Sequence, residues 1–215
     1  MTHAAGADKV VVAVHGPVAD ATPDVPGLRA WSVLRPHPDE PAVQPDGVGA
    51  VVMAWLDPGA GADPASWFDA PVFAYRVDEV VPIDWDGRGR EPWVRDWPDG
   101  TPTPAIVQCS FVRRLPSLSR AEFAAHWHAA HAPLVPVHHP GVARYVQNVV
   151  VDRLTSDAPE VDGIAQLYFR TAHDLHERFY DSEAGRRRVG EDVARFIDRP
   201  RGWRITARET WLRSY

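Results

Sequence analysis

Residues 118–148 read LSRAEFAAHWHAAHAPLVPVHHPGVARYVQN, and this stretch decides how the rest of the chain is interpreted. It opens with a helix start: Ser119 is a favourable N-cap, and Glu122 is spaced to close a capping box. Pro133 and Pro136 are expected to end the helix, because proline lacks an N–H donor and clashes with the preceding turn.

The stretch also holds five of the ten histidines: His126, His128, His131, His138 and His139. At about 100° per residue, one helix face collects Phe123, Trp127, Ala130 and Leu134, which predicts an amphipathic helix lying on a core. On this projection His131 lies beside the apolar face, His126 lies on its other flank, and His128 points outward. His131 is therefore the titratable group best placed to enter a pocket between the helix and the core.

Composition excludes several function classes. The net charge of -6 and the pI near 5.9 argue against nucleic acid or an anionic membrane as a partner. The single cysteine, Cys109, lies in an apolar run and allows no internal disulfide, which suits a reducing compartment. No signal-peptide pattern and no apolar run of about 20 residues is present, so we expect a soluble, cytoplasmic protein.

Short apolar runs separated by Gly and Pro predict strands over residues 9–14, 26–34, 46–57, 75–85, 105–114, 140–151, 162–170 and 203–212. Short helices are predicted over residues 63–70, 172–180 and 183–197, in addition to the histidine-rich helix. The segment 86–104 is rich in Gly, Pro and charge and is interpreted as a linker.

The two halves repeat one another. PGLRAW (26–31) matches PGVARY (140–145), so Trp31 corresponds to Tyr145, and DGVGAVVMAW matches DGIAQLYFRT. The element order predicts an α+β chain of tandem ferredoxin-like βαββαβ repeats that form a pseudo-dimer. We assign a degenerate repeat to residues 1–85 and a complete one to residues 105–215; the first lacks room for a helix like the one after Ser119.

The second half resembles the EthD family of dimeric α/β-barrel (ferredoxin-like) proteins. The resemblance is carried by FVRRLPSLSRAEFAAHWHAAHAPL, HPGVARYVQN and VDGIAQLYF and covers roughly residues 105–212. It implies a four-stranded antiparallel sheet with helices on one face, two such sheets meeting in a barrel. Relatives include polyketide cyclases, decarboxylases, dehydratases and cofactor-free quinone-forming monooxygenases. It also implies that His131 is the family's helix histidine, that Tyr145 and Asn148 lie on the next strand, and that Asp162 is its turn aspartate.

Each candidate site residue has a structural alternative. His131, with an ordinary pKa near 6.5, suits proton transfer but is also compatible with a core histidine bonded to backbone. Tyr145 could donate to an enolate oxygen or simply fill the core, and strand alternation sets Asn148 on the opposite face. Asp162 precedes Gly163 in a turn repeated at Asp46-Gly47, which favours a structural role. A metal at His128 and His131 is disfavoured, because His128 points away and no HExxH or Cys pair is present.

The sequence therefore predicts a cofactor-independent enzyme that acts by acid/base chemistry on a small hydrophobic, aromatic or polyketide-like carbonyl compound, as a cyclase, dehydratase or decarboxylase. The predicted catalytic residues are His131, Tyr145 and Asp162. The predicted substrate-binding residues are Trp127, His128, Asn148, Tyr168, Phe169 and Trp203, with only one of Tyr168 and Phe169 facing inward. Two alternatives stay open, a non-catalytic small-molecule-binding or structural module and a cofactor-free monooxygenase. Further pairing into a homodimer is also left open.

Overall fold

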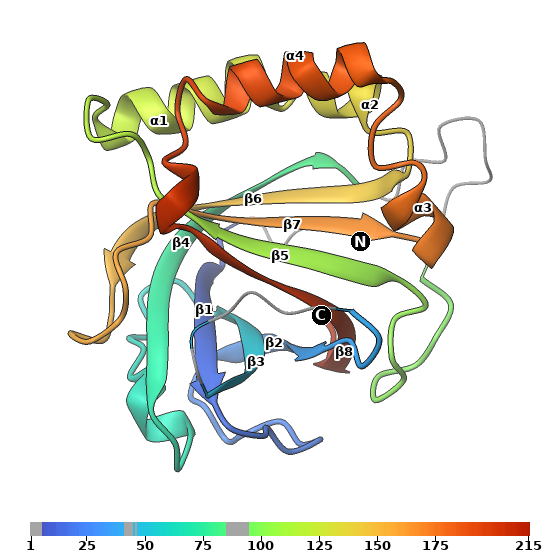
Figure 1. The fold of residues 1–215 in the computed structure, drawn as a ribbon. Helices are drawn as coiled ribbons and strands as arrows, with labels where there is room; N and C mark the ends of the chain where they lie inside the picture. Colours follow the sequence, from blue (N-terminus) through green and yellow to red (C-terminus); the bar gives the residue numbers. More distant parts are fainter. Residues whose placement is uncertain (1–5, 41–44, 46, 85–94) are drawn as a thin grey trace.

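A computed structural model of the protein describes residues 6–40, 45, 47–84 and 95–215. Within these residues, eight strands close into one antiparallel barrel in the order β1-β3-β2-β8-β5-β7-β6-β4 (Figure 1). The strands are β1 (Asp8–His15), β2 (Leu28–Pro36), β3 (Val48–Leu56), β4 (Val72–Ile83), β5 (Ile106–Val112), β6 (Val142–Arg153), β7 (Gly163–Phe169) and β8 (Trp203–Arg213). Each lies within a few residues of a strand that the sequence predicts.

Each half of the chain contributes four neighbouring strands. The first half is ordered β4-β1-β3-β2 and the second β8-β5-β7-β6, which is the same order within each half. The β2–β8 and β4–β6 pairings join the halves. Successive side chains on a strand point alternately into and out of the barrel, and residues such as Val11, Cys109 and Tyr168 fill its interior.

The helices lie on the second half. They are α1 (Arg120–His126), the π-helical turn η2 (Trp127–His131), α2 (Leu134–His138), α3 (Ala172–His176) and α4 (Glu183–Val193). α4 lies alongside α1 and α2 on the outer face of the barrel, above β6 and β7 (Figure 1). Among the described helices, none has the length and apolar character needed to cross a membrane.

The first half departs from the predicted βαββαβ repeat. Its described residues contain no α-helix, and the expected helix at 63–70 is a single 3-10 turn, η1 (Pro64–Trp67). The outer face is covered by Trp67 and Phe68, which pack against Trp31. A full tandem ferredoxin-like repeat is therefore not confirmed, although the strand order recurs. Much of the predicted linker (residues 86–94) and Asp46 of the repeated turn lie outside the described residues.

The capping box at the start of α1 is confirmed. The Ser119 hydroxyl accepts from the backbone N–H of Glu122 at 3.2 Å, and the Glu122 carboxylate accepts from the N–H of Ser119 at 2.8 Å. The predicted end of the helix is confirmed at Pro133, since the segment formed by α1 and η2 ends at His131, but it is wrong at Pro136. After a turn at residues 132–133, α2 begins at Leu134 and includes Pro136.

The π turn changes which residues face the core. The backbone N–H of Ala132 bonds the carbonyl of Trp127 at 3.0 Å, five residues back, so the turn holds an extra residue. As a result Ala130, predicted on the apolar face, is exposed, and His131 is buried with only 8% of its surface accessible. This local irregularity brings the histidine from the edge of the apolar face into the interior.

Candidate active site

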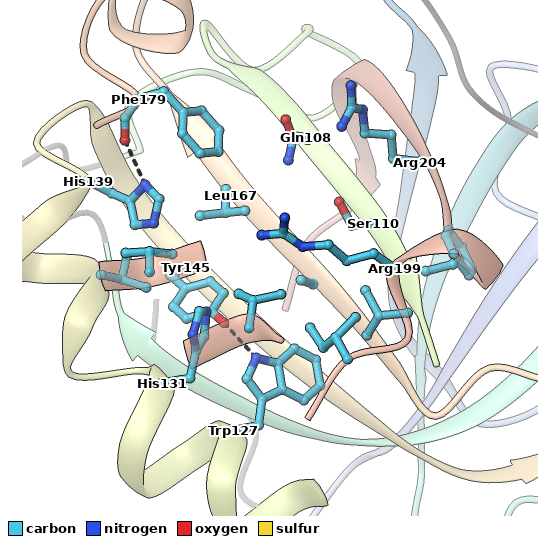
Figure 2. Close-up of a pocket in the computed structure, with 18 of the residues that line it drawn as sticks. Gln108, Ser110, Trp127, His131, His139, Tyr145, Leu167, Phe179, Arg199 and Arg204 are labelled. Carbon is cyan, nitrogen blue, oxygen red and sulfur yellow. Dashed lines mark hydrogen bonds between the residues drawn. The ribbon is translucent and has the colours of Figure 1, made fainter. Parts of the chain in front are cut away.

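A cavity of about 680 Å³ lies between the helices and the outer face of the second-half sheet (Figure 2). The helices contribute Trp127 and His131 from η2, Val135 from α2, and Val189 and Val193 from α4. The sheet contributes Gln108, Ser110, Tyr145, Ala165, Leu167 and Arg204. Because its walls are largely apolar and aromatic with a few polar groups, the cavity has the character of a small-molecule site.

His131 is held by a carboxylate from α4. Its Nδ1 lies 2.9 Å from Oδ2 of Asp192, and the other oxygen of Asp192 lies 3.0 Å from Nε2 of His126. A carboxylate only accepts hydrogen bonds, so the Nδ1–H of His131 donates to Asp192 and Nε2 is left unprotonated in the neutral ring. Since His131 lines the cavity and makes no other hydrogen bond within the described residues, Nε2 is the nitrogen available to a substrate.

The protonation state of His131 suits a base. Burial lowers the pKa of His131 from its ordinary value of 6.5, and the hydrogen bond and charge of Asp192 oppose this shift only in part. The ring is therefore neutral at pH 7, and its Nε2 lone pair can accept a proton.

This shift predicts the pH dependence of any reaction that uses His131 as a base. Activity should rise as the pH increases through a value below 6.5 and reach a plateau by neutral pH, because the neutral ring is the active form. Values of kcat/KM measured between pH 4.5 and pH 8 would show this rise. A rise in activity centred above pH 6.5 would contradict the assignment of His131 as the base.

Linkage gives the corresponding effect on stability. The folded protein holds His131 with a lower pKa than the unfolded chain, so the unfolded chain binds more protons at acidic pH. The contribution of His131 to stability is complete above about pH 6.5 and is lost as the pH falls through the folded-state pKa.

Tyr145 lines the same cavity as His131 (Figure 2). Its oxygen accepts hydrogen bonds from Nε1 of Trp127 at 2.7 Å and from Nε2 of Gln147 at 3.0 Å. Two accepted bonds occupy the oxygen lone pairs, so the O–H is left as a donor. Burial raises the pKa of Tyr145 to about 12, which keeps that proton in place at neutral pH.

Gly163 on β7 provides the space that Trp127 occupies. A Cβ at this position would lie 2.9 Å from Cη2 of Trp127, closer than real Cβ contacts, and 3.0 Å from Cζ of Phe123, which is tighter than most of them. Gly163→Ala is therefore expected to lower the free energy of unfolding by about 1–3 kcal/mol, measured by urea denaturation. Gly190→Ala is the matched control, because only Nη2 of Arg199 lies near its Cβ position, at 3.9 Å, and it should be neutral or stabilising. An equal effect in both variants would contradict this packing argument.

The structure brings together only some of the predicted site residues. Trp127, His131, Tyr145 and Trp203 all line the cavity. Asn148 and Tyr168 do not, because their positions on β6 and β7 turn them into the barrel interior, where Asn148 donates to the Ile164 carbonyl at 2.9 Å. Phe169 is buried in the layer between sheet and helices but also lies outside the cavity.

Asp162 and His128 are also corrected. Asp162 accepts from the backbone N–H of Arg114 at 3.0 Å and lies 3.2 Å from the Nε of that residue, in a separate pocket. It therefore fixes the turn between strands. His128 does not point outward as projected, since its Nδ1 lies 2.5 Å from Oε1 of Gln147, but it does not line the cavity. Within the described residues, no group of three or more His, Cys, Asp or Glu is arranged to hold a metal.

Sequence reasoning missed Asp192, which is 61 residues from His131. A signal was present: Gly185, Val189, Asp192 and Phe196 are spaced 4, 3 and 4 apart, so an aspartate stands on the buried face of a helix. His139, to which the sequence assigns no role, also lines the cavity, and its Nδ1 lies 2.6 Å from the Phe179 carbonyl.

Comparisons with known proteins found one family model that matches part of the chain and solved structures that share its fold. The EthD domain model matches residues 115–200. An anthrone oxidase-like protein of known structure shares the fold with a TM-score of 0.57, at 12% identity over 96% of this chain and 94% of its own. A "putative monooxygenase" from Lactobacillus acidophilus NCFM shares it with a TM-score of 0.52, at 7% identity over 98% of both chains. No curated protein matches the chain.

Each of these structural matches covers nearly the whole chain. The shared fold therefore includes the first half, which has few helices, as well as the second half, which holds the cavity. Residues 115–200 therefore match the EthD domain model, and they lie within an eight-stranded single-chain barrel whose fold the two solved structures share.

Proposed function

We propose that the protein is a cofactor-independent enzyme that removes a proton from a small aromatic or polyketide-like carbonyl compound. The observation that carries this proposal is the Asp192–His131 pair, which directs an unprotonated imidazole nitrogen to an apolar cavity beside the Tyr145 hydroxyl. His131 would take a proton from carbon next to the carbonyl group, and Tyr145 would donate to the oxygen of the resulting enolate.

The cavity also bears on the non-catalytic alternative. A structural module would be expected to fill this space with tryptophan, and a binding module would keep the cavity but could dispense with a tuned base. Here a volume of about 680 Å³ lies next to a histidine with a shifted pKa, which supports the enzyme.

Two reactions could follow proton removal. In a cyclase or dehydratase, the enolate would attack a second carbonyl or expel water. In a cofactor-free monooxygenase, the enolate would react with O₂, so that a CH₂ group becomes C=O and the second oxygen atom leaves as water. The names of the two structural neighbours favour the second reaction.

Anthrone is a suitable probe, because its methylene group is acidified by a carbonyl and two aromatic rings. Deuterium exchange at this methylene, measured under nitrogen and above the buffer rate, reports proton removal alone. Oxygen uptake in air then separates the monooxygenase from the lyase. Neither exchange nor uptake with anthrone or related aromatic ketones would contradict the proposed function.

A further inference from the structure

Two arginines face the cavity from the side away from His131. Arg199 lies on the 3-10 turn η3 (Arg199–Arg201), and Arg204 lies on β8 directly across from Ser110 of β5. Figure 2 shows Arg199 extending toward the middle of the lining residues, with Arg204, Gln108 and Ser110 on the side away from His131. The described lining residues include no aspartate or glutamate, so this part of an acidic protein is locally positive.

Neither guanidinium group has an acidic partner among the described residues. Within the part of the chain that the structure describes, Arg199 and Arg204 form no ion pair and no side-chain hydrogen bond. Nearby arginines that do not line the cavity behave differently: Arg201 lies 3.5 Å from Asp198, and Arg113 pairs with Glu160. The cavity therefore contains donors for which the described residues supply no acidic partner.

The position of these groups fits an amphiphilic ligand. Both side chains are largely exposed, so they lie at the open side of the cavity, whereas His131 and Tyr145 are buried. Apolar residues such as Leu167 and Phe179 also line the cavity, and Figure 2 shows Leu167 near the middle of the labelled residues and Phe179 beside His139. The Arg199 guanidinium also lies over Gly190 of α4, where a missing side chain leaves it space.

A guanidinium group offers a planar fork of donors that matches a carboxylate. We propose that the substrate is an aromatic carbonyl compound bearing a carboxylate, which Arg199 and Arg204 bind at the mouth while the reacting carbon lies beside His131. Gln108 and Ser110 would add neutral hydrogen bonds at the same end. This inference rests on the proposed function for the reacting end only; the anion site is argued from the arginines themselves.

The test compares two unreactive fluorescent probes, anthracene-2-carboxylate and anthracene-2-carboxamide, titrated into the full chain. The wild-type protein should bind the carboxylate about 10-fold more tightly, and Arg199→Gln and Arg204→Gln should each weaken that binding about 3- to 5-fold, as expected for partly exposed ion pairs. Binding of the carboxamide should not change. Arg201→Gln is the matched control, since it removes one charge from the same turn and should affect neither probe.

Equal affinity for the two probes, failure of both to bind, or an equal loss in Arg201→Gln would each overturn the anion site. The outcome is independent of turnover. A carboxylate preference without deuterium exchange in anthrone or anthrone-2-carboxylate would overturn the proposed function and leave the anion site standing. Exchange without a carboxylate preference would do the opposite.

Discussion

Replacing His131 with alanine is expected to reduce deuterium exchange at the anthrone methylene by about 10²- to 10⁴-fold, the range for loss of a general base. The reason is that the Nε2 lone pair of His131 would be lost, while the lining retains no other base held by a buried carboxylate. The measurement is the initial exchange rate under nitrogen, followed by mass spectrometry.

Two controls distinguish loss of the catalytic base from loss of folded protein in His131→Ala. His173→Ala removes an exposed histidine of α3 and should leave the rate unchanged. Added imidazole should restore part of the activity of His131→Ala, because the deleted ring leaves space next to the cavity, and a purely structural role would give no such rescue. Exchange at the wild-type rate in His131→Ala would exclude His131 as the base.

Replacing Asp192 with asparagine is expected to lower the same rate by about 10²- to 10⁴-fold, as seen when the aspartate of a His–Asp pair is made neutral. Asp192 accepts from both His126 and His131, but an asparagine amide has one acceptor and one donor end. When the NH₂ group faces His131, Nδ1 must accept, and the proton moves to Nε2, where it blocks the base.

The pH profile distinguishes this positioning role from simple destabilisation. Asp192 raises the pKa of His131 against the effect of burial, so its removal should lower that pKa further. The acidic limb of the residual activity should therefore move to lower pH in Asp192→Asn. Asp181→Asn is the matched control, because Asp181 contacts His138 at 3.3 Å away from the cavity and should leave both rate and limb unchanged. An unshifted limb in Asp192→Asn would contradict the role assigned to Asp192.

The strands, the capped start of α1 and the resemblance of the second half to the EthD domain model could all be predicted from the sequence. These features depend on neighbours close in the chain: alternation for the strands, and Ser119 with Glu122 for the cap. It also identified His131, Trp127, Tyr145 and Trp203, all of which line the cavity.

The surroundings of these residues depend on contacts that form only in the folded chain. The π turn, which no regular projection anticipates, places His131 in the interior. Asp192 reaches His131 only because α4 packs against η2 and α2. The two residues are 61 positions apart, and no sequence periodicity predicts a contact over that separation. The register of β6 and β7 turned Asn148 and Tyr168 into the barrel, since alternate residues on a strand face opposite sides and only the packing of the helices decides which side holds the cavity.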